Sequence, residues 1–197
     1  MEPSARQRKT SLLHTSPVEK PPDVGAQHAS PALVSYNQVP DWYRDNHFIR
    51  HGYRPVSHSA RACVASWCYL HNESVNIFTH LLPALFFLVA EHTTFQDLQA
   101  QYPNATLGDR LIFAFFLLTA TLCLGMSAIF HTLMNHSMPV CQFWLQLDFI
   151  GILILTLGDF VSGIYMIFYC EPVLKRVYWG MVCTTTASTI LPPLTSR

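Results

Sequence analysis

The sequence has few charged residues. Asp, Glu, Lys and Arg make up 12% of its 197 residues, whereas 50% are hydrophobic. The 37 residues between Arg110 and Asp148 contain none of these four types. A helix of a soluble protein carries a polar face, and the segment DRLIFAFFLLTATLCLGMSAIF shows none. This scarcity of charge argues against a soluble all-helical protein and indicates a membrane protein.

Three further features are absent. No apolar run follows the basic residues near the N-terminus, so we expect no secretory signal there. The six cysteines form no C-x-x-C pair, and we therefore infer neither disulfides nor a thiolate metal site. The sequence also lacks the internal repeats that indicate a solenoid.

The apolar segments predict three membrane spans, at about 74–91, 110–134 and 143–169. A single helix through the uncharged stretch would be about 55 Å long, against a hydrocarbon core of about 30 Å. The turn-forming sequence NHSMP at 135–139 divides it into two spans. A fourth span begins near Val177 but has only about 15 residues before the next prolines, so we expect it to be incomplete.

The chain has three parts of different composition. Residues 1–40 are rich in Pro, Ser, His and Gln and predict a disordered cytosolic arm. Residues 41–73 mix aromatic residues with four arginines and predict a membrane-proximal cytosolic segment, with an interfacial helix from about Ser59. Residues 74–197 form the multi-pass helical membrane domain, which we expect to be incomplete.

The basic residues predict the orientation. Eight of the twelve Lys and Arg residues precede the first span, whereas 92–109 contains none. Positive charge favours the cytosolic side, so we expect a cytosolic N-terminus. We expect the membrane to be the plasma membrane or the endoplasmic reticulum. The glycosylation triplet Asn104-Ala105-Thr106 agrees with a lumenal loop, whereas Lys175 and Arg176 count against the assignment.

This topology brings polar residues of three spans to the cytosolic side of the membrane. Spacings of three and seven place Glu73, Asn76 and His80 on one face of the first span. Ser127 and His131 share a face near the end of the second span, and Asp148 stands at the start of the third. Ionisable groups at membrane depth often mark a functional site. A histidine with a carboxylate is suitable for holding a metal ion and its water.

Simpler interpretations remain open for each of these residues. Glu73 and Asn76 are also suited to capping a helix N-terminus, and His80 to an interhelical hydrogen bond. Ser127 is also explained as a small residue between packed helices, and His131 and Asp148 as interfacial residues. Asp159 lies on the face of Asp148 but about 16 Å deeper, where a relay and a structural hydrogen bond are both open.

Several motifs together resemble one family. GYR at 52–54, HNESVNIFTH at 71–80, SAIFH at 127–131 and QLD at 146–148 are similar to the successive signatures of the progestin and adiponectin receptors. This family is also called the hemolysin-III-like membrane proteins, and the resemblance is strongest to its fungal members. It implies an all-α membrane protein, the N-terminal part of a seven-transmembrane helix bundle, with three full spans and an incomplete fourth.

The resemblance also implies a zinc site like that of ceramidase-type lipid-amide hydrolases. His131 matches a zinc ligand, Asp148 the aspartate that holds or activates the zinc-bound water, and Ser127 the serine one turn before that ligand. These assignments make Asp148 and Ser127 the candidate catalytic residues. A supporting polar role is expected for Glu73, Asn76 and His80. We expect partners among membrane lipids, including a sphingolipid ligand, and among full-length relatives, but not nucleic acid.

Two further zinc ligands of the family form an H-x3-H pair on a seventh span, and the sequence ends at Arg197 before such a span. We therefore expect an incomplete and inactive N-terminal portion, whether as a genuine short product or as a truncated gene model. The alternative function is a proton- or ion-coupled transporter or channel that uses Asp148 and Asp159.

Overall fold

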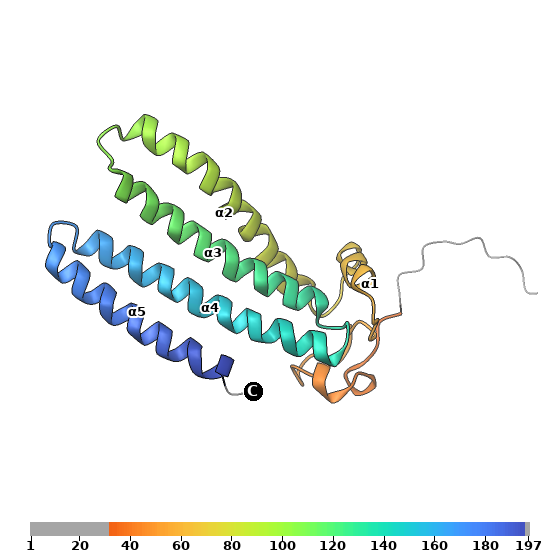
Figure 1. Cartoon of the computed structure of the whole chain (residues 1–197). Coiled ribbons are helices and arrows are strands. Elements are labelled where there is room, and N and C mark those ends of the chain that lie inside the picture. The colour runs from red at the N-terminus through yellow and green to blue at the C-terminus, as the bar shows by residue number, and fades with distance from the viewer. Residues whose placement is uncertain (1–31, 196–197) are drawn as a thin grey trace, which may run out of the picture. The chain divides into compact units, whose positions relative to one another are not determined.

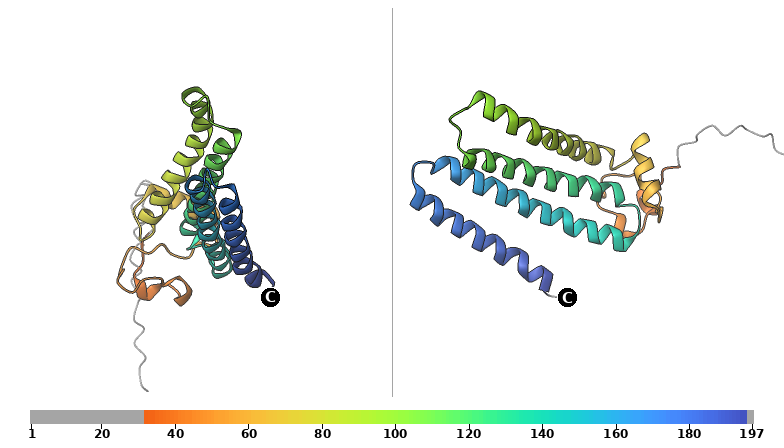
Figure 2. Two further views of the ribbon diagram at one scale, coloured as in Figure 1. Left: turned by 90° about the vertical axis from the view of Figure 1, so that its left-hand side faces the viewer. Right: turned by 45° about the horizontal axis from the view of Figure 1, so that its top comes forward.

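The computed structural model describes residues 32–195, which belong to one compact unit. The described residues contain no β-strand, and the all-helical prediction is confirmed. Four long helices follow one another: α2 (Ser74–Gln101), α3 (Leu107–Leu133), α4 (Met138–Ile167) and α5 (Pro172–Thr195). They lie side by side in chain order, each antiparallel to the one before it (Figures 1 and 2).

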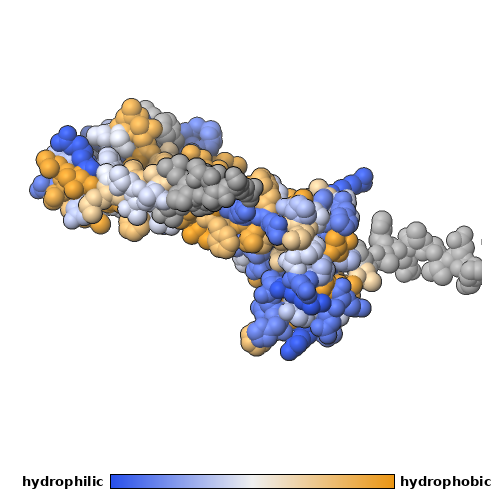
Figure 3. Space-filling view, turned by 60° about the horizontal axis from the view of Figure 1, so that its bottom comes forward, coloured by the Kyte–Doolittle hydropathy of each residue, from blue (hydrophilic) through white to orange (hydrophobic). Residues whose placement is uncertain are grey.

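Three of these helices are long and apolar enough to cross a membrane. The spans are Ser74–Thr94, Leu107–Leu133 and Met138–Ile167. Apolar side chains predominate along the bundle, and hydrophilic ones gather around the segment that precedes it (Figure 3). The three predicted spans are therefore confirmed, and within the described residues α5 does not meet the same criterion.

The ends of the helices differ from the prediction. α2 continues to Gln101 rather than ending near 91, so the predicted loop at 92–109 shrinks to 102–106. α4 begins at Met138 rather than near 143, with Pro139 in its first turn. Proline is favoured at the start of a helix because that N–H has no helical partner. Pro139 therefore lies in the first turn of α4, whereas the prediction placed it in the turn between the two spans.

A folded segment precedes the bundle. It contains the short helices η1 (Tyr36–Gln38), η2 (Asp41–Tyr43), α1 (Ala60–Ala65) and η3 (Ser66–Cys68). Val39, Tyr43 and Tyr53 are buried against Phe130, near the end of α3. The disordered arm was predicted over 1–40, but residues 32–40 belong to this folded segment, and residues 1–31 lie outside the described residues. Ser59 accepts a hydrogen bond from the Ala62 N–H, so α1 begins where the interfacial helix was predicted.

Two glycines bring α4 close to α3. A Cβ atom on Gly151 would lie 3.1 Å from the Cα of Cys123, and one on Gly158 would overlap the side chain of Thr119. Small residues at such contacts let membrane helices approach each other closely. Asp148 lies one turn before Gly151, so this close contact also positions Asp148 relative to α3.

We predict that Gly158→Ala destabilises the α3–α4 pair, because the new methyl group meets Thr119. Overpacking of this kind costs about 1–3 kcal/mol. Gly163→Ala is the matched control, since a Cβ there has nothing within 4 Å, and it should leave stability unchanged or slightly higher. Thermal unfolding of both variants in detergent micelles checks the prediction. Equal melting temperatures for the two variants would contradict it.

Candidate functional site

A buried carboxylate stands at the start of α2. Glu73 directly precedes the helix and is fully buried. Asn72 Nδ2 donates to Glu73 Oε1 at 2.6 Å, and Asn76 Nδ2 donates to Glu73 Oε2 at 2.9 Å. The backbone N–H of Glu73 donates to His71 Nδ1 at 3.1 Å. The two asparagines and the adjoining turn thus fix the carboxylate in place.

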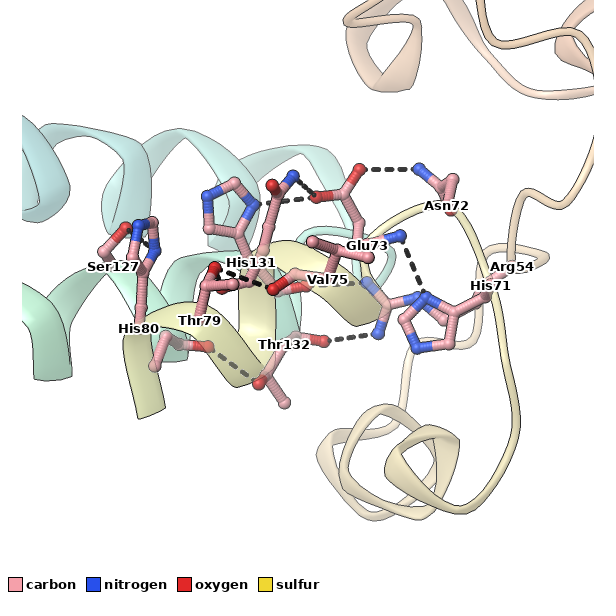
Figure 4. A network of polar contacts seen from close by, with 12 residues as sticks. Arg54, His71, Asn72, Glu73, Val75, Thr79, His80, Ser127, His131 and Thr132 are labelled. Carbon is pink, nitrogen blue, oxygen red and sulfur yellow. Dashed lines mark hydrogen bonds and ion pairs between the residues drawn. The ribbon is translucent and has the colours of Figure 1, made fainter. Parts of the chain in front are cut away.

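This carboxylate reaches across to α3. Glu73 Oε2 lies 2.8 Å from His131 Nδ1, and the side chain of His131 is only 17% exposed (Figure 4). An ionised carboxylate only accepts hydrogen bonds, so His131 carries a proton on Nδ1. In neutral imidazole the lone pair is then on Nε2, the arrangement found in histidines that bind metals.

The surroundings keep Glu73 ionised. Burial by itself raises the pKa of a carboxyl group. The hydrogen bonds from His131 and Asn76 and the charge of Arg54 act in the opposite direction and outweigh it, so the pKa of Glu73 lies below its usual value. Burial, followed by the charge of Arg54, lowers the pKa of His71 to about 4. His71 is therefore neutral at pH 7 and can accept the Glu73 N–H.

A second contact joins α2 to α3 beside the first. Ser127 Oγ lies 2.9 Å from His80 Nδ1. The ring centroids of His80 and His131 are 5.6 Å apart, and both rings extend to the same side of the two helices (Figure 4). The structure thus brings together Glu73, Asn76, His80, Ser127 and His131.

Asp148 and Asp159 lie differently. Asp148 is half-buried on α4 and makes no hydrogen bond or ion pair with any described residue, although its charge acts on His80. Asp159 is exposed farther along α4, where it lines a cavity of about 260 Å³ with Ser162 and Phe116. Asp148 therefore adjoins the cluster, and Asp159 is not part of it.

Arg54 is the residue whose role the sequence did not indicate. It is fully buried, and its guanidinium donates to the carbonyl oxygens of His131 at 2.7 Å and Thr132 at 2.9 Å. It also donates to Ser66 Oγ at 2.9 Å. The last carbonyls of a helix lack helical partners and are stabilised by cations. Arg54 thus holds the end of α3, and the GYR motif was the only signal that pointed to it.

The described residues contain no group of three or more His, Cys, Asp or Glu side chains that could hold a metal ion. His131 alone has the features of a ligand, because a carboxylate fixes its Nδ1 proton. A zinc site built on His131 would need ligands from outside this cluster.

Residues 68–197 match the family model described as haemolysin-III related. The chain belongs to this family. Its relatives include Progestin and adipoQ receptor-like protein 1 of Caenorhabditis elegans, 40% identical over 76% of this chain and 34% of the relative. The Adiponectin receptor protein of Drosophila melanogaster is 36% identical over 78% and 34%, respectively. The ADIPOR-like receptor IZH2 of Saccharomyces cerevisiae is 35% identical over 77% and 50%.

These relatives confirm the resemblance seen in the sequence, and fungal receptors are among them. The chain spans between about a third and a half of the length of the curated relatives it matches. It is a multi-pass helical membrane protein of the receptor-like haemolysin-III family.

We predict that Glu73 makes stability depend on pH below about 4.5, its ordinary pKa. Because folding lowers this pKa, the stabilisation is fully present above the unfolded-state value and is lost as pH falls through the folded-state value. Melting temperatures between pH 7 and pH 3 should therefore fall for the wild type. Glu73→Gln should be less stable at pH 7, by about 1–3 kcal/mol, and should lose less on acidification.

Glu171→Gln is the matched control, because Glu171 is exposed and its side chain makes no hydrogen bond with a described residue. Its pH profile should follow the wild type. A Glu73→Gln profile that also follows the wild type would contradict the assigned ionisation of Glu73.

Proposed function

We propose that the chain is part of a membrane receptor with a zinc site, and that His131 is one ligand of that site through Nε2. The hydrogen bond between Glu73 and His131 carries the proposal, because it puts the proton on Nδ1 and leaves the lone pair on the other nitrogen. The family relationship supports a receptor. The ligand that we propose is a lipid amide of the ceramide class, reached from the membrane.

The fit of zinc to the described residues is partial. His131 suits the ion, but no group of three suitable side chains surrounds it among the residues described. By the resemblance, the other ligands are an H-x3-H pair on a later span. Zinc lowers the pKa of a bound water and polarises a carbonyl group. We derive no hydrolytic step through it from one ligand.

The roles that we propose for the other residues concern this chain alone. Glu73 holds the Nδ1 proton of His131, with Asn76 fixing the carboxylate oxygen that accepts it. Asp148 keeps the role of proton acceptor, since its carboxylate makes no hydrogen bond with another described residue and its charge reaches the cluster at His80. Ser127 acts through His80.

A transporter that uses Asp148 and Asp159 is less well supported. Eleven residues of helix separate the two carboxylates by about 16 Å, and Gly151, Ile152 and Leu155 occupy the face between them. None of these side chains can pass a proton. Charge movement in reconstituted vesicles, abolished by Asp159→Asn and indifferent to zinc chelation, would favour the transporter.

We predict that zinc added to the purified chain perturbs the His131 Nε2 signal in ¹⁵N NMR but is not retained. After dialysis against a weak chelator, elemental analysis should find well below one zinc per chain, because one histidine binds too weakly. Glu73→Gln should weaken the titrated binding about 10- to 100-fold, and Glu171→Gln should leave it unchanged.

An unperturbed His131 signal at saturating zinc would rule out His131 as a ligand. Near-equimolar zinc after dialysis, lost in His131→Ala, would show that the ligand set is complete in this chain.

We also propose that the N-terminus is cytosolic, in the plasma membrane or the endoplasmic reticulum. Eight of the twelve basic residues precede the first span, which supports this side. Protease added to sealed vesicles with the cytosolic side outward should remove the N-terminal arm and spare the loop at 102–106. Cleavage of the loop with protection of the arm would reverse the orientation. Detergent lysis, which exposes both, is the control.

A further inference from the structure

In the neighbouring histidines His80 and His131, the Nδ1 atoms have different hydrogen-bond partners. Nδ1 of His131 contacts the Glu73 carboxylate, whereas Nδ1 of His80 contacts the Ser127 hydroxyl. The rings are 5.6 Å apart between centroids, and both extend to one side of α2 and α3 (Figure 4). A carboxylate can only accept a hydrogen bond, but a hydroxyl can donate or accept. The proton position on His80 therefore depends on Ser127.

The hydroxyl of Ser127 makes one hydrogen bond with the described residues, and it is not to its own helix. Two threonine hydroxyls in these helices donate to a carbonyl of the preceding turn: Thr79 to Val75 at 2.7 Å and Thr132 to Ala128 at 2.7 Å. Ser127 is 6% exposed, and its only hydrogen bond among the described residues is with His80 Nδ1. If His80 donated, the Ser127 proton would be buried without an acceptor, at a cost of about 1–3 kcal/mol. Ser127 is therefore the donor.

A histidine whose Nδ1 accepts a hydrogen bond carries its proton on Nε2 when neutral. The two rings are thus held in opposite tautomers. His131 presents a lone pair from Nε2, and His80 presents an N–H from the same position of its ring.

We propose that Ser127 fixes His80 as a hydrogen-bond donor, through Nε2–H, for an oxygen of the ligand that binds beside His131. This rests on the proposed function, in which that oxygen is the carbonyl oxygen of a lipid amide. A donor held in place before binding polarises the carbonyl without moving a proton. His80 contacts the ligand, and Ser127 is a positioning residue that acts through His80.

The tautomers are measured by long-range ¹H–¹⁵N correlation on the whole chain labelled with [¹⁵N]histidine, in micelles at neutral pH. We expect a protonated Nε2 in His80 and a protonated Nδ1 in His131. Ser127→Ala should convert His80 to a mixture of tautomers, whereas Ser127→Thr keeps the hydroxyl and should preserve the pattern. Ser162→Ala is the control, because it removes a hydroxyl that donates to the Ile112 carbonyl and contacts neither histidine.

A wild-type His80 protonated on Nδ1 or on both nitrogens would overturn the proposal, as would a Ser127→Ala spectrum unchanged from the wild type. The ¹H–¹⁵N correlation measures the proton position on each nitrogen and needs neither zinc nor turnover. The tautomer of His80 is therefore tested independently of the proposed function.

The ligand role is tested with N-hexanoyl-sphingosine, a short-chain ceramide, titrated into the same sample. Loss of one neutral hydrogen bond weakens binding about tenfold, so His80→Leu should bind this amide about tenfold more weakly. His80→Gln, whose side-chain amide can place an N–H near the same position, should stay close to the wild type. Equal affinity in His80→Leu and the wild type would overturn the donor role. If the amide perturbs neither histidine, the proposed substrate class fails, and the tautomer of His80 alone decides whether it is a fixed donor.

Discussion

The buried carboxylate of Glu73 is the contact on which the rest of the site depends. A fully buried charge is costly unless it is paired and hydrogen-bonded. Glu73 meets this requirement with two asparagines from its own helix start and with His131 from α3. Satisfying the carboxylate therefore joins α2 to α3 and fixes the imidazole of His131 at once. The contact that packs α2 against α3 therefore also places the proton of His131 on Nδ1.

His131 is held at two points from two directions. Glu73 binds its ring, and Arg54 binds its backbone carbonyl from the segment before the bundle. The same guanidinium bonds the next carbonyl, so the end of α3 is fixed in position and its histidine in orientation. The segment before the first span is thus part of the site, because without Arg54 the last carbonyls of α3 would lose these donors.

The sequence predicted the spans and the faces better than the contacts. Scarcity of charge located three membrane helices, and the spacing of Glu73, Asn76 and His80 placed them on one face of the first. Spacing could not decide between a helix cap and a place in the supporting polar cluster for Glu73, because both suit a carboxylate at a helix start. Burial decides it, since Glu73 is closed off from solvent and bonded to His131.

Other contacts had no local signal in the sequence, although the GYR motif contains Arg54. Arg54 bonds to a residue 77 positions away, and no periodicity relates the two. Pro139 was interpreted as part of a turn, although the same residue suits the first turn of a helix, where α4 places it. Ser127 was open to interpretation as a small packing residue, and only its hydrogen bond with His80 distinguishes its role.

The coupling between Glu73 and His131 is measured most directly by a double-mutant cycle. The unfolding free energies of the wild type, Glu73→Gln, His131→Gln and the double variant are compared in one detergent at pH 7. A buried contact between a charged group and its partner predicts a coupling energy of about 1–3 kcal/mol. Additive effects, with a coupling below about 0.5 kcal/mol, would contradict a carboxylate that holds His131 across the two helices.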